Sequence, residues 1–163
     1  MKLAPSIAVV SDGAAGNELQ ALALAGVLSS APPRVWQLQP GWPYAVLVPQ
    51  FAPVLAPQQW RPPLIETPWP DIAIGAGRIG AAALLTLKRA SSGRTRTVQI
   101  LNPRIDPARF DLVIAPAHDR LFGANVISVE GSLHAIDAAW LARERLGSEQ
   151  LRRLQGPRTV VLV

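Results

Sequence analysis

Short apolar runs, rich in β-branched residues and bounded by turn formers, recur along this 163-residue chain and constrain its fold more than any other feature. A run of this kind is typical of a strand that is covered on both faces. Helical periodicity follows several of the runs, and strands that alternate with helices form parallel pairs. We therefore expect an α/β fold, with a Rossmann-like, mostly parallel sheet and helices on both of its faces. The expected strands lie at residues 7–10, 34–38, 71–74, 95–101, 112–115 and 126–129, and the expected helices at 17–30, 79–90 and 138–154.

The loop between the first expected strand and the first expected helix contains Asp12, Gly13, Gly16 and Asn17. We expect Asn17 to cap the helix, with Gln20 completing a pair that resembles a capping box. Glycines let the backbone approach a ligand, and the free N–H groups of a helix's first turn favour an anion. The loop is therefore a candidate for one wall of a cleft that binds an anion. The alternative, that its glycines serve only the tight turn, stays open.

A second loop, at residues 75–80, matches the pattern G-x-G-x-x-G that is typical of dinucleotide-binding sites. The acid that would bind a ribose hydroxyl should end the following strand, but no carboxylate stands there before Asp106. We therefore expect no dinucleotide, and the sequence indicates no other cofactor. Gly75, Gly77 and Arg78 are expected at the same sheet edge as the first loop, contacting an anion or a hydroxyl group. A solvated surface role for Arg78 stays open.

His118 and Asp119 follow the expected strand at 112–115 and are the leading catalytic candidates. A histidine beside an acid at a strand end supplies a general base and a group that orients it. The alternative, that Asp119 only pairs with Arg120 on the surface, stays open. His134 on the next loop is a secondary candidate, with helix capping or packing as its alternative. Because these are the 2 histidines of a chain with 0 cysteines, we expect no metal site.

Residues 32–70 contain most of the 16 prolines and all but one of the 5 tryptophans. Proline excludes a continuous helix, so we expect only short helical turns near residues 44–48 and 51–55. The segment is too apolar for a disordered linker and should fold against the domain. It is either a satellite core under a long loop or an apolar flap that docks on a membrane or holds an acceptor lipid.

The net charge of +5 comes almost entirely from arginine, since Lys2 and Lys88 are the only lysines. Arginine prefers phosphate and carboxylate partners. The arginines are dispersed and no aromatic and basic RNA-binding signature is present, so nucleic acid is not an expected partner. The chain has no signal-peptide pattern and no apolar run of about 20 residues. We expect a cytoplasmic protein and leave a peripheral association with a membrane open.

Three segments read SDGAAGNELQ at residues 11–20, PDIAIGAGR at 70–78 and FDLVIAPAHDR at 110–120. Together and in this order they resemble the mitochondrial fission "elongated mitochondria" family, whose bacterial members are often labelled predicted nucleoside-diphosphate-sugar epimerases. The first loop of that family commonly has histidine where this chain has Asn17. The resemblance therefore supports no role for Asn17 as a base.

The resemblance implies the N-terminal domain of a two-domain GT-B-like fold that acts on nucleotide-activated sugars, by glycosyl transfer or by sugar epimerisation. In such folds the C-terminal domain usually holds the nucleotide sugar, and the N-terminal domain presents the acceptor. Carried over to this chain, residues 12–17 face the interdomain cleft, residues 75–78 flank it, and His118 is the best candidate for the base.

The same resemblance sets the expected domain boundaries. Residues 158–163 resemble the start of the family's second half, so we expect one domain at 1–156 and the start of a second at 157–163. That second domain would bind the nucleotide sugar, and an isolated first domain is expected to be inactive. Plant relatives act in organelle division, so a non-catalytic scaffold that binds a partner or a membrane stays open as the alternative.

Overall fold

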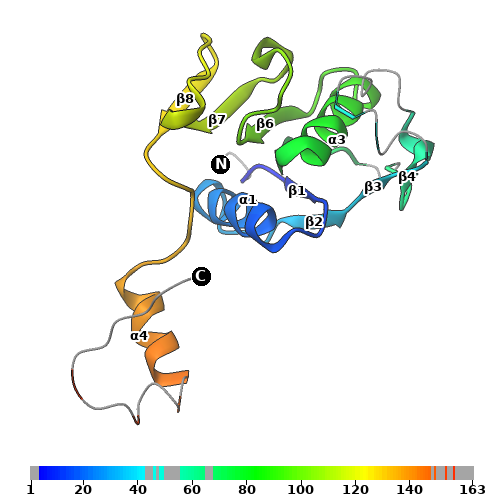
Figure 1. Cartoon of the computed structure of the whole chain (residues 1–163). Helices are drawn as coiled ribbons and strands as arrows, with labels where there is room; N and C mark the ends of the chain where they lie inside the picture. The colour runs from blue at the N-terminus through cyan, green and yellow to red at the C-terminus, as the bar shows by residue number, and fades with distance from the viewer. Residues whose placement is uncertain are drawn as a thin grey trace.

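Six parallel strands form the central sheet, in the order β2-β1-β5-β6-β7-β8 (Figure 1). The computed structural model describes residues 4–42, 46, 48–49, 56–64, 68–147, 149, 153 and 156. All six expected strands are present, and their ends differ from the prediction by at most about two residues, as is usual at element boundaries. Their bounds are Ile7–Ser11 for β1, Arg34–Gln37 for β2, Ile72–Ala76 for β5, Arg96–Ile100 for β6, Leu112–Pro116 for β7 and Val126–Val129 for β8.

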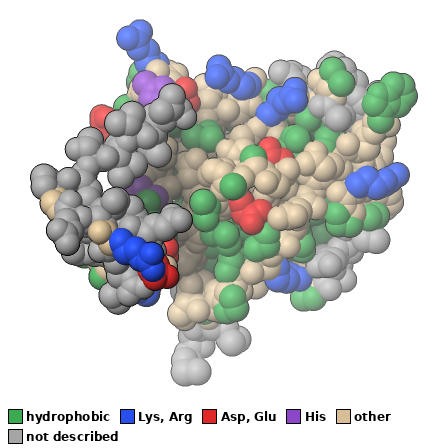
Figure 2. Space-filling view, turned by 60° about the horizontal axis from the view of Figure 1, so that its bottom comes forward, with side chains coloured by type: hydrophobic (Ala, Val, Ile, Leu, Met, Phe, Trp, Pro, Cys, Tyr) green, Lys and Arg blue, Asp and Glu red, His purple; other side chains and the backbone are tan. Residues whose placement is uncertain are grey.

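Helices α1 (Ala15–Leu28) and α3 (Gly77–Ala90) cover opposite faces of this sheet, which confirms the Rossmann-like α/β prediction. Successive side chains of a strand point to opposite faces, so β5 contributes Ile74 to the core under α1 and Ala73 to the core under α3. Helix α3 is buried along most of its length. Helix α1 instead buries only Ala21 and Ala25, and Figure 2 shows hydrophobic side chains at the surface on its side of the molecule.

Both helices begin earlier than predicted. Ala14, not Asn17, is the N-cap of α1, and Gln20 bonds to the carbonyl oxygen of Gly16 instead of completing a capping box. The prediction was wrong because side chains earlier in the loop, Ser11 and Asp12, already fold the backbone into the first turn. In α3 the predicted turn is absent, because Gly77, with φ +68°, passes directly from β5 into the helix.

The proline-rich region contributes a small antiparallel sheet that the sequence analysis missed. Strand β3 (Gln39–Pro40) pairs with β4 (Trp60–Arg61), which follows the short 3-10 helix η2 (Pro57–Gln59). Trp60 is fully buried against α3, and its indole N–H donates to the Thr86 hydroxyl over 3.3 Å. Leu38, Val48 and Leu64 belong to the same core. The described residues of this region therefore pack into the main core under α3 and do not form the separate satellite core that was predicted. The predicted turns at 44–48 and 51–55 lie largely outside the described residues.

Helix α4 (Ala138–Gly147) lies apart from the sheet, below α1 in Figure 1. Asp137 caps it, since its Oδ1 accepts the backbone N–H of Trp140 over 2.6 Å. Most of the predicted continuation to residue 154 lies outside the described residues. Residues 158–163, the expected start of a second domain, also lie outside them, so that domain boundary stays a prediction.

Two aspartates stabilise the amino edge of the sheet, by which we mean the side at which the parallel strands begin, and both do so through the same hydrogen bonds. Asp71, just before β5, accepts the backbone N–H of Ser6 over 2.8 Å and its hydroxyl over 2.7 Å. Asp111, just before β7, accepts the same two groups of Thr97 over 2.9 and 2.8 Å. In each case the carboxylate ties its strand to the neighbouring strand.

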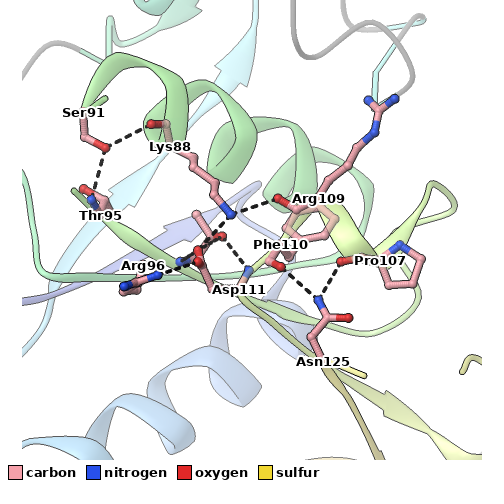
Figure 3. A network of polar contacts seen from close by, with 10 residues as sticks. Lys88, Ser91, Thr95, Arg96, Pro107, Arg109, Phe110, Asp111 and Asn125 are labelled. Carbon is pink, nitrogen blue, oxygen red and sulfur yellow. Dashed lines mark hydrogen bonds and ion pairs between the residues drawn. The ribbon is translucent and has the colours of Figure 1, made fainter. Parts of the chain in front are cut away.

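Asp111 also forms ion pairs with Lys88 and Arg96, each over 3.1 Å (Figure 3). Partial burial raises the pKa of Asp111, but the hydrogen bonds from Thr97, Lys88 and Arg96 outweigh it and lower that pKa to about 2. The hydroxyl and backbone hydrogen bonds from Ser6 likewise lower the pKa of Asp71. Both carboxylates are therefore held in their charged form by groups of the fold itself.

Candidate functional site

The strand order places a topological switch point between β1 and β5. Helices α1 and α3 leave these adjacent strands towards opposite faces of the sheet. Open α/β sheets bind their ligands at the carboxyl ends of the strands near such a point. The loops that follow β1, β5, β6 and β7 therefore form the edge where a site is expected.

Each of these four loops carries a residue in the left-handed backbone region. They are Gly13, Gly77, Leu101 and Arg120, with φ of +83°, +68°, +68° and +48°. For a residue with a Cβ, such as Leu101, this conformation costs on the order of 1 kcal/mol. Strained backbone clusters at binding sites, where the rest of the fold holds it in place, so the carboxyl edge is a candidate site on this ground as well.

A pocket of about 470 Å³ opens at this edge, between the loops that follow β5, β6 and β7. The structure brings four predicted site residues together in it, namely Gly77, Arg78, His118 and Asp119. Its full lining is Gly77, Arg78, Leu101, Asn102, Arg104, Pro116, His118 and Asp119. The sequence analysis did not propose Asn102 or Arg104, although both follow an expected strand at the same edge as the residues that it did propose.

His118 and Asp119 lie in the 3-10 helix η4 (Ala117–Asp119), directly after β7. The side chain of His118 is 81% exposed and that of Asp119 is 20% exposed. Their Nε2 and Oδ1 atoms are 3.9 Å apart, which is too far for a hydrogen bond. The imidazole is thus open to a ligand, with a carboxylate close enough to stabilise it electrostatically when it carries a proton.

The loop after β1 lies beside this pocket but does not line it. The N–H groups of Gly13 and Ala14 donate to Ser11 Oγ and Asp12 Oδ1, each over 3.0 Å. These two donors are therefore occupied within the loop, and Glu18 places a negative charge in the first turn of α1. Anion binding by Asp12, Gly13 and Gly16 stays a prediction, which this geometry does not favour.

Asn17 connects the two loops. A Cβ added to Gly77 would lie 2.9 Å from Asn17 Nδ2, so the Asn17 amide packs against the start of α3. Gly75 and Gly80 serve packing, because a Cβ on Gly75 would lie 2.8 Å from Val10 Cγ2 and 3.1 Å from the Gly80 carbonyl oxygen. The G-x-G-x-x-G pattern thus brings α3 close to the sheet and leaves Gly77 at the pocket.

The start of α3 favours an anion more than the start of α1 does. Ala76 provides no side-chain cap for α3, and the first turn contains no acidic residue. The four N–H groups at the start of a helix have no partner within it, and the helix dipole makes this end positive. Arg78 and Arg104 add two exposed cations to the same pocket. Among the described residues, no acceptor or acid is bonded to either guanidinium group.

The comparisons with known proteins give one finding. Residues 15–163 match the family described as mitochondrial fission ELM1. The chain belongs to this family. None of the curated proteins and none of the solved structures gives a match. Among the described residues of this ELM1-family chain, no helix is long and apolar enough to cross a membrane.

Gln99 supports the floor of the pocket in this ELM1-family chain, and the sequence analysis missed it. It is fully buried in β6. Its Nε2 donates to the carbonyl oxygens of Ile100 at 2.7 Å, Gly77 at 3.1 Å and, at 3.4 Å, Leu101. Two of these residues line the pocket. Its Oε1 is buried without a hydrogen-bond partner among the described residues. A glutamine between Val98 and Ile100 in a mostly buried strand was the signal in the sequence.

His134 does not belong to the same pocket. It lies near the C-terminal half of α1, in a separate depression of about 100 Å³ that includes Leu24, Val27 and Leu133. Its Nδ1 accepts the backbone N–H of Ile136 over 3.2 Å. In the part of the chain that the structure describes, no three acidic or histidine side chains gather where they could hold a metal ion.

Proposed function

We propose that this chain is the N-terminal half of a GT-B-like protein that acts on nucleotide-activated sugars, by glycosyl transfer or by sugar epimerisation. In this proposal it forms the acceptor side of the interdomain cleft, and a second domain beyond residue 156 binds the nucleotide sugar. The observation that supports it is the pocket beside the switch point, where Arg78, His118 and Asp119 gather. Membership of the ELM1 family is compatible with such a fold.

In the proposed reaction, His118 is the proton acceptor. Its exposed imidazole takes the proton from an acceptor hydroxyl, or from the sugar carbon in an epimerisation, and Asp119 stabilises the imidazolium that results. Arg78 and the start of α3 hold the anionic or hydroxyl groups of the substrate.

The test uses the natural gene product and a panel of UDP-, GDP- and CMP-sugars, with binding measured by calorimetry and turnover by release of the nucleotide. We expect one class of donor to bind and His118→Ala to lower kcat by about 100-fold or more, the usual contribution of a general base. His134→Ala is the matched control, because it removes the other histidine outside the pocket. Failure of every donor to bind, with His118→Ala as active as the unmodified protein, would contradict the proposal.

We propose a non-catalytic scaffold as the second candidate, because the proline-rich region presents large apolar side chains to solvent. Trp42 is 88% exposed and Val46 is 75% exposed. A membrane surface is the partner that such side chains would contact. Co-sedimentation with liposomes tests this function: Trp42→Ala should weaken binding and His118→Ala should not. Trp60 is unsuitable as a probe, because it is part of the core.

A further inference from the structure

We propose that the pocket recognises a phosphate group, held between Arg78, Arg104 and the first turn of α3. The proposal deepens the proposed function, on which it rests, because it makes the acceptor a phosphate-bearing molecule. It adds Arg104 to the site. It also moves the anion contact from the loop after β1 to the loops after β5 and β6.

The two arginines reach the pocket from different loops. Arg78 is in the first turn of α3, directly after β5, and Arg104 follows β6. Arg104 has φ +60°, and its backbone N–H donates to Asn102 Oδ1 over 2.9 Å, which fixes the turn that carries it. Two arginine side chains that come from different segments of the chain can contact different oxygens of the same ligand.

The charge balance of the pocket favours an anion. Among the described residues that line it, Asp119 is the single acid against the two arginines, so their net charge is +1 with His118 counted as neutral. Arginine binds phosphate and carboxylate through paired N–H groups, and these charge-assisted bonds are among the strongest hydrogen bonds in proteins.

The directions of the donors favour phosphate over carboxylate. The backbone N–H groups of a helix start point along the helix axis, and the two guanidinium groups come from different segments, Arg78 from α3 and Arg104 from the loop after β6. A tetrahedral phosphate presents oxygens in several directions, whereas the two oxygens of a carboxylate lie in one plane.

The experiment titrates the 163-residue chain with inorganic phosphate and follows by NMR the backbone amides of residues 77–80 and those of Leu101, Asn102 and Arg104. The double variant Arg78→Gln/Arg104→Gln should raise the dissociation constant by about 10-fold or more. The matched control, Arg94→Gln/Arg143→Gln, removes the same charge at the amino edge and on α4, and should change the constant less than twofold. An equal loss in both variants, or no saturable binding, would overturn the proposal.

Competition experiments then identify the chemistry of the bound anion and the kind of molecule that carries it. Acetate should compete at least 10-fold more weakly than phosphate, and equal competition would overturn the assignment to phosphate. Glycerol 3-phosphate tests a soluble phosphate monoester. Phosphatidylcholine vesicles with and without phosphatidic acid test a lipid phosphate. Competition by either source supports the proposal and shows which one fits the pocket.

The experiments distinguish a failure of the phosphate site from a failure of the proposed function. Phosphate binding that depends on Arg78 and Arg104 can be present even if no nucleotide sugar binds the natural gene product, which would leave the phosphate site and remove the sugar chemistry. Conversely, turnover that depends on His118 without a phosphate contact at the two arginines would leave the sugar chemistry and remove this inference.

Discussion

The two edges of the sheet carry charged residues in opposite states. At the amino edge, Asp71 and Asp111 accept hydrogen bonds from neighbouring strands, and Asp111 also pairs with two cations. At the carboxyl edge, Arg78 and Arg104 line a pocket with no bonded partner among the described residues. Charges satisfied by the fold stabilise it, whereas unsatisfied charges around a pocket are available to a ligand. The comparison therefore separates charged groups that hold the sheet together from charged groups that are open to a ligand.

The largest expected effect tests the amino edge against a matched acid at the carboxyl edge. Asp111→Ala should lower the free energy of unfolding by about 3 kcal/mol, because it leaves the Thr97 backbone N–H without its acceptor and removes the carboxylate that pairs with Lys88 and Arg96. Asp119→Ala should change it by less than about 0.5 kcal/mol, because among the described residues its charged neighbour, His118 Nε2, is 3.9 Å away and no hydrogen bond to the carboxylate is lost. Urea unfolding followed by circular dichroism measures both. If the two variants lose the same free energy of unfolding, the acids at the two edges do not differ in how much they stabilise the fold.

Gln99 tests the comparison between the two edges in another way, because it stabilises the fold at the carboxyl edge, beneath the pocket. Gln99→Leu should lower the free energy of unfolding by about 2 kcal/mol, since the buried carbonyl groups of Gly77 and Ile100 lose their donor. The control is Gln37→Leu, an exposed position whose amide bonds only to the Glu18 carboxylate. The same urea experiment applies. A Gln99→Leu protein as stable as the control would mean that the pocket floor does not depend on this amide.

Much of the fold could be predicted because its signals are local. Runs such as 112–116 identify their own strands, and the rule that parallel strands end at one edge brought Arg78 and His118 into the same pocket. The rest depends on contacts between distant segments. Strands β3 and β4 have two residues each and are too short to show a period.

The start of α1 and the pocket floor show the same limit. Asn17 is a good cap by residue type, but the hydrogen bonds of Ser11 and Asp12 fold the turn three residues earlier. The role of Gln99 requires knowing that β6 lies next to β5, because one of its acceptors, the Gly77 carbonyl, is 22 positions away in sequence. Arg104 becomes a site residue only once its loop is placed beside the start of α3.

The smallest expected effect is the acid titration of the amino edge. The pKa of Asp111 is about 2 in the folded protein and near 4 in the unfolded chain, so the carboxylate contributes stability above pH 4. As the pH falls from about 4 to 2, the unfolded chain takes up this proton while most of the folded protein does not, so about 1 to 2 kcal/mol of stability is lost. Asp111→Asn should therefore be less stable at pH 7 but show a flatter profile between pH 4 and 2. Urea midpoints at several pH values measure this slope, and a variant as steep as the unmodified chain would mean that another carboxylate carries the acid sensitivity.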